Sequence, residues 1–217
     1  MSMEKKITSV KVLTPEERDE CIAVLDEVYL KEKNWINSSE QVIPKDLEHN
    51  TKQSWFLVKV NHEPAGVLRL EYDPCLNFPP ELKVTLKDHI DVEELKKSGR
   101  FVDIGRFAIL PKYRRNIMVA LRLMRSAIKE VVERDYTHFI TDVFENEPTS
   151  PLKFHTRILG FEVIGSHIHG ELNCSCTRII LTMDIIKAYE KLKQRGAKIS
   201  ETLTLGFSHL LEKKIKV

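Results

Sequence analysis

The sequence predicts a mixed β-sheet with helices on its faces, a fold in the α+β or α/β range. Segments with the alternating pattern of strands are interleaved with segments whose apolar residues recur at helical spacing. The chain has 217 residues, of which 42% are hydrophobic, and a chain of this size can bury a substantial core. We find no internal repeat and no low-complexity segment, so a repeat architecture is excluded.

The first elements are a strand over 7–13 and a helix that follows it directly. Thr14 is a residue type that caps helices, and Pro15 suits the first helical position. Apolar residues at helical spacing continue to Tyr29, so we expect one helix up to that point. After Trp35 the pattern becomes polar, which predicts a loop or a loop with a short helix.

The middle of the chain predicts two strands, 54–60 and 65–72, joined by the turn residues 61–64. A long excursion over 73–100 follows, with a short helix near 91–97. Loops of this length in compact domains often act as lids or binding loops, and we expect this one to close over a site.

The second half of the chain alternates strands and helices again. Gly160 follows a short helical segment and is suited to end it as a C-cap. The tail from Ile186 is helical and amphipathic in places. The expected elements are a strand at 101–110, a helix at 115–134, a strand at 138–144, a helix at 150–160 and strands at 161–168 and 177–185.

Composition limits the range of functions. The formal net charge of +2 is too small for a chain whose whole surface binds nucleic acid, so an anion site must come from a local cluster. No apolar run reaches the roughly 18 residues that a membrane span needs, and the N-terminus lacks the long apolar segment of a secretory signal. The four cysteines are too few and too scattered for a disulfide framework, which favours a cytoplasmic protein.

The stretch VDIGRFAILPKYRRNIMVA, residues 102–120, combines an apolar strand, a basic turn and the start of a helix. Helix-start amides and the helix dipole favour a negative charge, and Arg114 and Arg115 add cations there. The turn contains no glycine, so it suits a single phosphodiester or an acidic protein surface better than a bulky diphosphate. The alternative is that both arginines form a solvated helix cap.

The order of these elements resembles the GNAT superfamily of N-acyltransferases over residues 7–185, most closely over 101–161. The resemblance implies a mostly antiparallel central sheet with two strands that splay apart and helices on both faces. It also implies one GNAT-like acyltransferase domain at 1–185, with 186–217 as a helical tail packed on the same domain. The glycine positions of the family's pyrophosphate turn hold larger residues here.

A subgroup is more similar: the acyl-homoserine-lactone synthases and N-acyl amino acid synthases, which commonly take the acyl chain from acyl carrier protein. Their Glu-x-Ser-Arg-Phe strand motif reads Asp103-Ile104-Gly105-Arg106-Phe107 here. Further matches are Tyr29 and Trp35, Asp46, and Arg69 in a Gly-x-x-Arg strand. Leu25 and His49 stand where the lactone synthases have an arginine and an acid, which puts the lactone product in doubt more than the acyl transfer.

The resemblance assigns roles to these residues. Asp103 is the candidate general base, because an amine must lose a proton before it attacks a thioester. Arg69 or Arg106 would anchor the acceptor, since a guanidinium suits a carboxylate. Tyr29, Trp35 and Asp46 would contact substrate. The remaining candidates are Phe107, Ala108 and Ile109 for the pantetheine arm, and Arg114, Arg115, Asn116, Ile117, Met118, Val119 and Ala120 for the phosphate.

Structural roles compete with these assignments. Arg106 would equally form a buried ion pair with Asp103, Asp46 or Asp142. Arg69 would equally be an exposed strand residue. Tyr29 and Trp35 would equally be core aromatics, since aromatic residues at helical spacing usually are.

Two histidine-containing segments are also candidates. His155 lies beside the position where GNAT enzymes often carry a tyrosine, so it is a candidate proton donor to the leaving thiolate, or else a surface helix residue. His167, His169, Cys174 and Cys176 have the chemistry of zinc ligands, but their spacings match no familiar zinc module, so we expect no metal.

The sequence as a whole therefore predicts a cytoplasmic, autoinducer-synthase-like N-acyltransferase. Its donor would be acyl carrier protein or acyl-CoA, and its acceptor a small amine or an amino acid. An acetyl-CoA-dependent N-acetyltransferase and a non-catalytic ligand-binding module remain open, as do monomer and homodimer. No nucleic-acid partner is expected.

Overall fold

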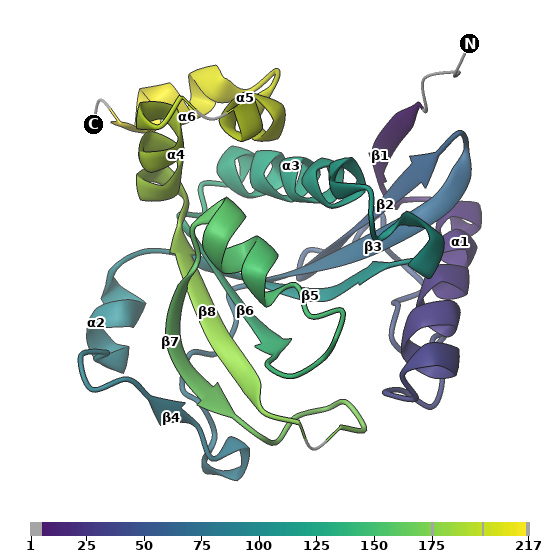
Figure 1. The fold of residues 1–217 in the computed structure, drawn as a ribbon, viewed down its shortest axis with the longest axis horizontal. Coiled ribbons are helices and arrows are strands. Elements are labelled where there is room, and N and C mark those ends of the chain that lie inside the picture. Colours follow the sequence, from purple (N-terminus) through teal and green to yellow (C-terminus); the bar gives the residue numbers. More distant parts are fainter. Residues whose placement is uncertain (1–5, 175, 197, 216–217) are drawn as a thin grey trace. The chain divides into compact units, whose positions relative to one another are not determined.

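The computed structural model describes residues 6–174, 176–196 and 198–215. It shows a mixed α+β fold with an eight-stranded sheet in the order β1-β2-β3-β5-β6-β8-β7-β4 (Figure 1). Of the strand pairs with a defined register, β5–β6 is parallel and the others are antiparallel. The prediction of a mixed, mostly antiparallel sheet with helices is thereby confirmed.

The chain forms two compact units, and β5 (Phe101–Ile109) contributes to both. The first unit contains the residues up to Glu71 together with Gly105–Glu130, and the second contains Tyr72–Ile104 together with the residues from Val131 onward.

Strands of the first unit pair as their sequences predict. β1 (Ile7–Lys11) pairs with β2 (Gln53–Val60), which pairs with β3 (Glu63–Tyr72). Gly66 of β3 allows a close approach to β5, because a Cβ there would lie 2.7 Å from the carbonyl oxygen of Ala108.

The first helix is α-helical only in part. Thr14 caps α1 (Pro15–Leu25) in a capping box with Glu17, as the sequence predicts. The helix then continues as the π-helix η1 (Asp26–Glu32), which the periodicity did not predict. Short π-helical segments are rare and occur frequently at functional sites. In this protein η1 carries Tyr29, one of the candidate substrate contacts.

The second unit contains the other end of the sheet. β6 (His138–Phe144) pairs with β8 (Arg178–Asp184), and β8 pairs with β7 (Glu162–His167). Gly160 has a φ of 88° and ends the π-helix η4 (Phe154–Leu159), which confirms its predicted capping role. The helices are α2 (Val92–Lys97), α4 (Ile185–Gln194), α5 (Lys198–Thr204) and α6 (Ser208–Ile215), besides the short 3₁₀ helix η2 (Pro80–Leu82) and the end of α3 (Ile117–Glu133).

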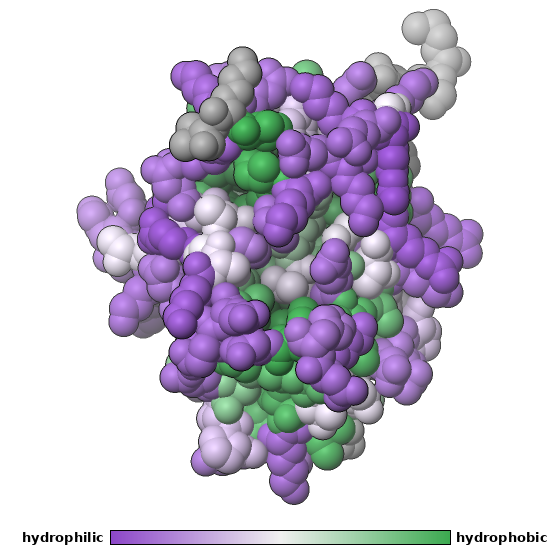
Figure 2. Space-filling model, turned by 90° about the vertical axis from the view of Figure 1, so that its left-hand side faces the viewer, coloured by the Kyte–Doolittle hydropathy of each residue, from purple (hydrophilic) through white to green (hydrophobic). Residues whose placement is uncertain are grey.

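The excursion over 73–100 is more ordered than a loop. Its short strand β4 (Thr85–Leu86) pairs with β7 and forms an edge of the sheet. Its partly buried apolar residues pack on a core cluster of the same unit: Phe78, Val84, Ile90 and Leu95 against Leu76, Phe101, Ile140, Ile164 and Ile180. Figure 2, which views the side of the molecule bearing α2 and β4, shows apolar surface between the hydrophilic side chains.

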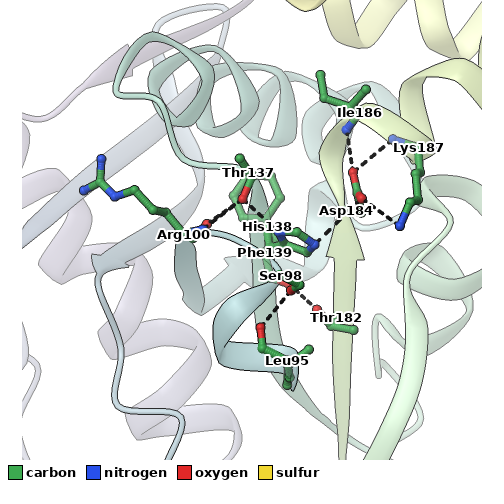
Figure 3. Close-up of polar contacts among 10 residues, drawn as sticks. All are labelled: Leu95, Ser98, Arg100, Thr137, His138, Phe139, Thr182, Asp184, Ile186 and Lys187. Atoms are coloured by element: carbon green, nitrogen blue, oxygen red, sulfur yellow. Dashed lines mark hydrogen bonds and ion pairs between the residues drawn. The ribbon is translucent and has the colours of Figure 1, made fainter. Parts of the chain in front are cut away.

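Polar contacts fix the junction of β8 and α4 (Figure 3). Asp184 caps α4 by accepting hydrogen bonds from the backbone N–H groups of Ile186 and Lys187, each at 3.0 Å. The ring of His138 contacts the hydroxyl of Thr137 at 2.8 Å and lies 3.8 Å from a carboxylate oxygen of Asp184. Burial lowers the pKa of His138, although Asp184 opposes this effect.

Among the described residues, no helix is both long enough and apolar enough to span a bilayer.

Candidate functional site

The strand β5 contains a strained residue at the centre of its motif. Arg106 has a φ of 52°, a left-handed conformation that a non-glycine residue adopts rarely and at a cost of about 1–3 kcal/mol. Such strain is concentrated at active sites and at β-bulges. Arg106 is 9% exposed, and its guanidinium lies 5.8 Å from the centre of the Tyr29 ring. This left-handed φ interrupts the extended backbone of β5 at Arg106.

Arg69 of β3 lies against Gly105 of β5. A Cβ at Gly105 would come within 2.6 Å of Nη2 of Arg69, so the missing side chain makes room for this guanidinium. The Arg69 side chain is only 12% exposed and lies 3.3 Å from a carboxylate oxygen of Glu71. The alternative of an exposed strand residue is wrong.

The two aromatic candidates contact each other. Tyr29 and Trp35 form an edge-to-face pair with ring centres 5.2 Å apart. Tyr29 is 7% exposed and belongs to the core, whereas Trp35 is half-buried. The motif thus brings Tyr29 together with Arg106 in the first unit.

Two carboxylates considered as partners of Arg106 have other contacts. Asp46 is 67% exposed and accepts a hydrogen bond from the backbone of His49 at 3.1 Å, which lowers its pKa. Asp142 contacts His167 and Arg178, at 3.0 and 3.4 Å. Burial opposes ionisation of Asp142, but the hydrogen bond from His167 and the charge of Arg178 keep its pKa below the ordinary value.

The basic turn is fixed by the contacts of Arg114 with β5 and η1. Arg114 donates from Nε to the carbonyl oxygen of Ile109 at 2.9 Å and forms a two-pronged ion pair with Glu32, at 2.8 and 2.5 Å. The hydrogen bond to Arg114 lowers the pKa of Glu32. Arg115, in contrast, is exposed. The contact between Arg114 and Glu32 could not be predicted from the sequence, because the two residues are 82 positions apart.

The start of α3 is capped by Asn116. Its side-chain oxygen accepts from the N–H of Met118 at 3.1 Å, and its carbonyl accepts from the N–H of Val119 at 3.0 Å. Ile117 is exposed and Ala120 buried, so only part of the predicted phosphate-binding run faces solvent. Asn116 thus performs part of the role that a bound anion would have at this helix start.

The backbone groups at the end of β5 lie next to β3. Leu110 donates to the carbonyl of Ala65 at 2.9 Å, and the carbonyl of Ala108 faces Gly66, so both residues direct their backbone groups to β3. The carbonyl of Ile109 accepts a hydrogen bond from Nε of Arg114 at 2.9 Å. Phe107, Ala108 and Ile109 remain the candidates for the pantetheine arm.

Asp103 belongs to the second unit and is half-buried. It is the last of three β5 residues in register with β6, where it faces Ile140. The next carbonyl, that of Ile104, accepts a hydrogen bond from the hydroxyl of Thr141 at 2.7 Å. The defined register ends at Asp103, whereas β5 continues to Ile109.

His155 is a core residue and not the surface residue considered above. It is 1% exposed, its Nδ1 lies 3.0 Å from the carbonyl oxygen of Pro151, and it packs edge-to-face on Phe161. Burial lowers the pKa of His155 to about 4, so the ring is neutral at physiological pH. These contacts favour a structural role.

The four zinc candidates do not assemble. Both ring nitrogens of His167 have partners: Nδ1 lies 2.5 Å from the carbonyl of His169, and Nε2 contacts Asp142. Cys174 accepts a hydrogen bond from the N–H of Cys176 at 3.4 Å. Within the described ranges, no group of three or more His, Cys, Asp or Glu side chains has the arrangement of a metal site.

Comparisons with known proteins agree with this geometry. Residues 20–177 match the model of the family described as N-acyl amino acid synthase FeeM. The structure of FeeM, an N-acyl amino acid synthase from uncultured soil microbes, superimposes with a TM-score of 0.66 at 13% identity, covering 90% of this chain and 100% of that one. A search of curated proteins gave no match.

Acetyltransferases share the fold at similar identity. Arabidopsis thaliana NAA60, in complex with a bisubstrate analogue, has a TM-score of 0.58 at 11% identity, with 82% of this chain and 98% of that one covered. The GNAT-family acetyltransferase from Streptococcus pneumoniae has 0.56 at 15%, with coverage of 83% and 99%. The family match, the GNAT fold and the β5 motif together lead to one conclusion: the chain belongs to the N-acyl amino acid synthase FeeM family and is a GNAT-fold N-acyltransferase.

Proposed function

We propose that this enzyme transfers an acyl group from a phosphopantetheine thioester to the amine of an amino acid or a related carboxylated amine. The observation that carries the proposal is the Arg69 guanidinium, which lies over Gly105 in the strand that bears the family's motif. A buried guanidinium is a strong and specific ligand for a carboxylate. An acceptor that carries a carboxylate beside its amine would use it.

Acyl transfer forms a C–N bond and breaks the C–S bond of the thioester. Asp103 is the proposed general base, which accepts the proton that the amine loses, directly or through a water molecule. Backbone groups of Phe107, Ala108 and Ile109 are proposed to hold the pantetheine arm, and an N–H among them to polarise the thioester carbonyl. The carbonyl of Ile109 is excluded from this role because it already accepts from Arg114. The thiolate leaves and takes a proton from solvent, because the neutral, buried His155 is suited to a structural role.

Substrate recognition would use the remaining motif residues. Arg115 and the exposed start of α3 are the proposed phosphate contacts, and Trp35 is the proposed wall of the substrate pocket. The exposed Asp46 would contact substrate only at the surface. The excursion over 73–100 keeps its proposed role as a lid, but its β4 pairing means that closure would involve the segments beside β4.

The proposed donor is acyl carrier protein or long-chain acyl-CoA in preference to acetyl-CoA. The turn lacks glycine, so a diphosphate cannot approach its backbone as closely as a single phosphodiester can. The proposed carrier protein would present acidic residues, and the exposed Arg115 offers them a complementary positive charge.

Thermal shift and single-turnover assays test this proposal together. A long-chain acyl carrier protein or acyl-CoA should stabilise the protein and acylate amino acids, while the decarboxylated amines of the same side chains should react at least about tenfold more slowly. Arg69→Gln should remove that preference. Strong stabilisation by acetyl-CoA, with no effect of the long-chain donors and equal reaction of amines and amino acids, would contradict the proposal.

A further inference from the structure

The contact between Arg114 and Glu32 has a consequence for the choice of donor. Each of the three guanidinium nitrogens of Arg114 donates a hydrogen bond. Nε donates to the carbonyl of Ile109, and Nη1 and Nη2 donate to the two oxygens of the Glu32 carboxylate. The two side chains are only partly exposed, at 23% and 28%. The arginine that the sequence motif assigns to the donor's phosphate is therefore already neutralised by a carboxylate of the first unit.

A second cation of the turn, Lys112, also has a carboxylate partner, in an exposed surface pair. Lys112 forms an ion pair with Glu63 at 2.8 Å, and the hydroxyl of Tyr113 donates to the same carboxylate at 2.9 Å. The hydrogen bond from Lys112 lowers the pKa of Glu63, as Arg114 lowers that of Glu32, so both acids are charged at neutral pH. Of the three cations in the turn, Arg115 is the one that is exposed and carries no such partner among the described contacts.

The amides at the start of α3 are reduced in number as well. Asn116 accepts from Met118 through its side chain and from Val119 through its carbonyl. A turn with one exposed guanidinium, a reduced set of amides and a fixed carboxylate beside it can balance a small negative charge. It disfavours a large one, since like charges brought close together at an interface are strongly unfavourable.

We propose that Glu32 is a specificity-determining residue that selects a donor with a single phosphate against coenzyme A. Coenzyme A carries a diphosphate and a further ribose phosphate, whereas phosphopantetheine on a carrier protein carries one phosphodiester. This inference rests on the proposed function, because it takes the α3 start as the place where the donor's phosphate binds. Glu32 acts without touching the reacting atoms.

A charge-graded series of ligands tests the role of Glu32. The ligands are the methyl phosphodiester of 4′-phosphopantetheine, dephospho-coenzyme A and coenzyme A, whose negative charge rises in that order. Their dissociation constants would be measured by calorimetry at fixed ionic strength. The variant is Glu32→Gln, which removes the charge and keeps an oxygen that Arg114 can bind. The matched control is Glu27→Gln, which removes a charge from the same π-helix where Glu27 pairs with Lys31 at 3.3 Å.

Glu32→Gln should tighten the binding of coenzyme A about tenfold relative to that of the phosphopantetheine phosphodiester, with dephospho-coenzyme A in between. The gain should shrink at high salt, and Glu27→Gln should leave the order unchanged. If Glu32→Gln does not fold, Glu32→Ala is measured in its place.

Two outcomes would overturn the inference. If the ligands bind but their relative affinities stay the same, or all change equally, Glu32 is only a structural anchor of η1. If no member of the series binds wild type or variant, the phosphate site itself is wrong, and the proposed function fails together with the inference.

Discussion

Gly105 and Arg69 show how a single missing side chain shapes the candidate acceptor site. Gly105→Ala would place a Cβ within 2.6 Å of the Arg69 guanidinium, and this flexible group would have to move. Because a charge-assisted hydrogen bond contributes about 1.5–3 kcal/mol, the KM for the amino-acid acceptor should rise by about tenfold or more. Steady-state kinetics with the donor saturating would measure it.

A double-variant cycle provides the control for this prediction. If the alanine acts through the guanidinium, Gly105→Ala should add little to Arg69→Gln, since the two changes remove the same contact. An unchanged acceptor KM in Gly105→Ala, or fully additive effects, would show that Arg69 does not bind the acceptor.

His155 should make stability depend on pH. Its pKa falls from 6.5 to about 4 in the folded protein, so the unfolded chain binds the proton more readily. Stability should therefore be complete above about pH 6.5 and should fall by about 3 kcal/mol as the pH drops towards 4. His155→Asn, which can still donate to the carbonyl of Pro151, should flatten this part of the profile.

Urea unfolding at a series of pH values would measure the effect of His155. Replacement of the exposed His89 by Asn is the matched control and should leave the profile unchanged. If the wild-type and His155→Asn profiles were parallel between pH 7 and 4, the histidine would not titrate in the way its burial implies.

Single residues differ in how far the sequence could predict them. The family resemblance identified Arg69, Arg106 and Tyr29 as site residues and Gly105 as part of the motif. Such patterns reflect contacts between distant strands. Glu32 was missed, since an ion pair between residues 82 positions apart leaves no local pattern. The burial of His155 was missed too, because one polar residue in a short helix does not reveal which face is covered.

At the scale of elements, periodicity predicted the long strands and helices to within a few residues. It failed where an element is short or irregular. β4 has two residues, too few for an alternating pattern, and its pairing with β7 depends on a distant strand. The π-helix η1 has the same local composition as an α-helix, so its wider turn could not be predicted.

Gly165 tests the pairing of β4 with β7. A Cβ at this position would lie 2.7 Å from the backbone oxygen of Thr85, which cannot move without breaking the pair. Gly165→Ala should therefore cost about 1–3 kcal/mol and speed amide exchange at Lys87, which donates to Ile164 at 2.9 Å. Hydrogen-exchange mass spectrometry would detect the change.

Ser166→Ala is the control for the β4 prediction, since it alters the neighbouring residue and leaves the backbone pair intact. Equal protection of Lys87 in Gly165→Ala and wild type would mean that β4 does not pack as closely as the geometry requires.

At the scale of the whole molecule, the C-terminal tail is proposed to be part of the folded domain. Phe207 is 1% exposed, and Lys214 of α6 pairs with Asp135 at 2.5 Å. Phe207→Ala should lower the free energy of unfolding by about 3–5 kcal/mol, because it leaves a cavity in the core. Chemical denaturation monitored by circular dichroism would measure the loss.

The exposed Leu205 provides the comparison for the tail. It is 59% exposed, so Leu205→Ala should change stability by no more than about 0.5 kcal/mol. Equal, small effects of both substitutions would show that the tail contributes little to the fold.

The fold could be predicted because the long strands and helices each have a clear hydrophobic pattern and follow one another in a known order. The chemistry of the site could be predicted less completely. Motif residues defined an acyl transfer, but the neutralisation of Arg114 and the capping by Asn116 depend on side-chain geometry. The missing glycines therefore indicated the donor preference, whereas the contacts of Glu32 and Asn116 that bear on it could be found only in the structure.

One measurement tests the central claim most directly. Wild-type enzyme and Asp103→Asn are incubated with long-chain acyl carrier protein or acyl-CoA and a mixture of amino acids, and released products are identified by mass spectrometry. We predict N-acyl amino acids from the wild type, and a rate lower by about 100-fold or more in the variant, as expected when a general base is removed. Equal product from both proteins, or acylated amines that lack a carboxylate, would contradict it.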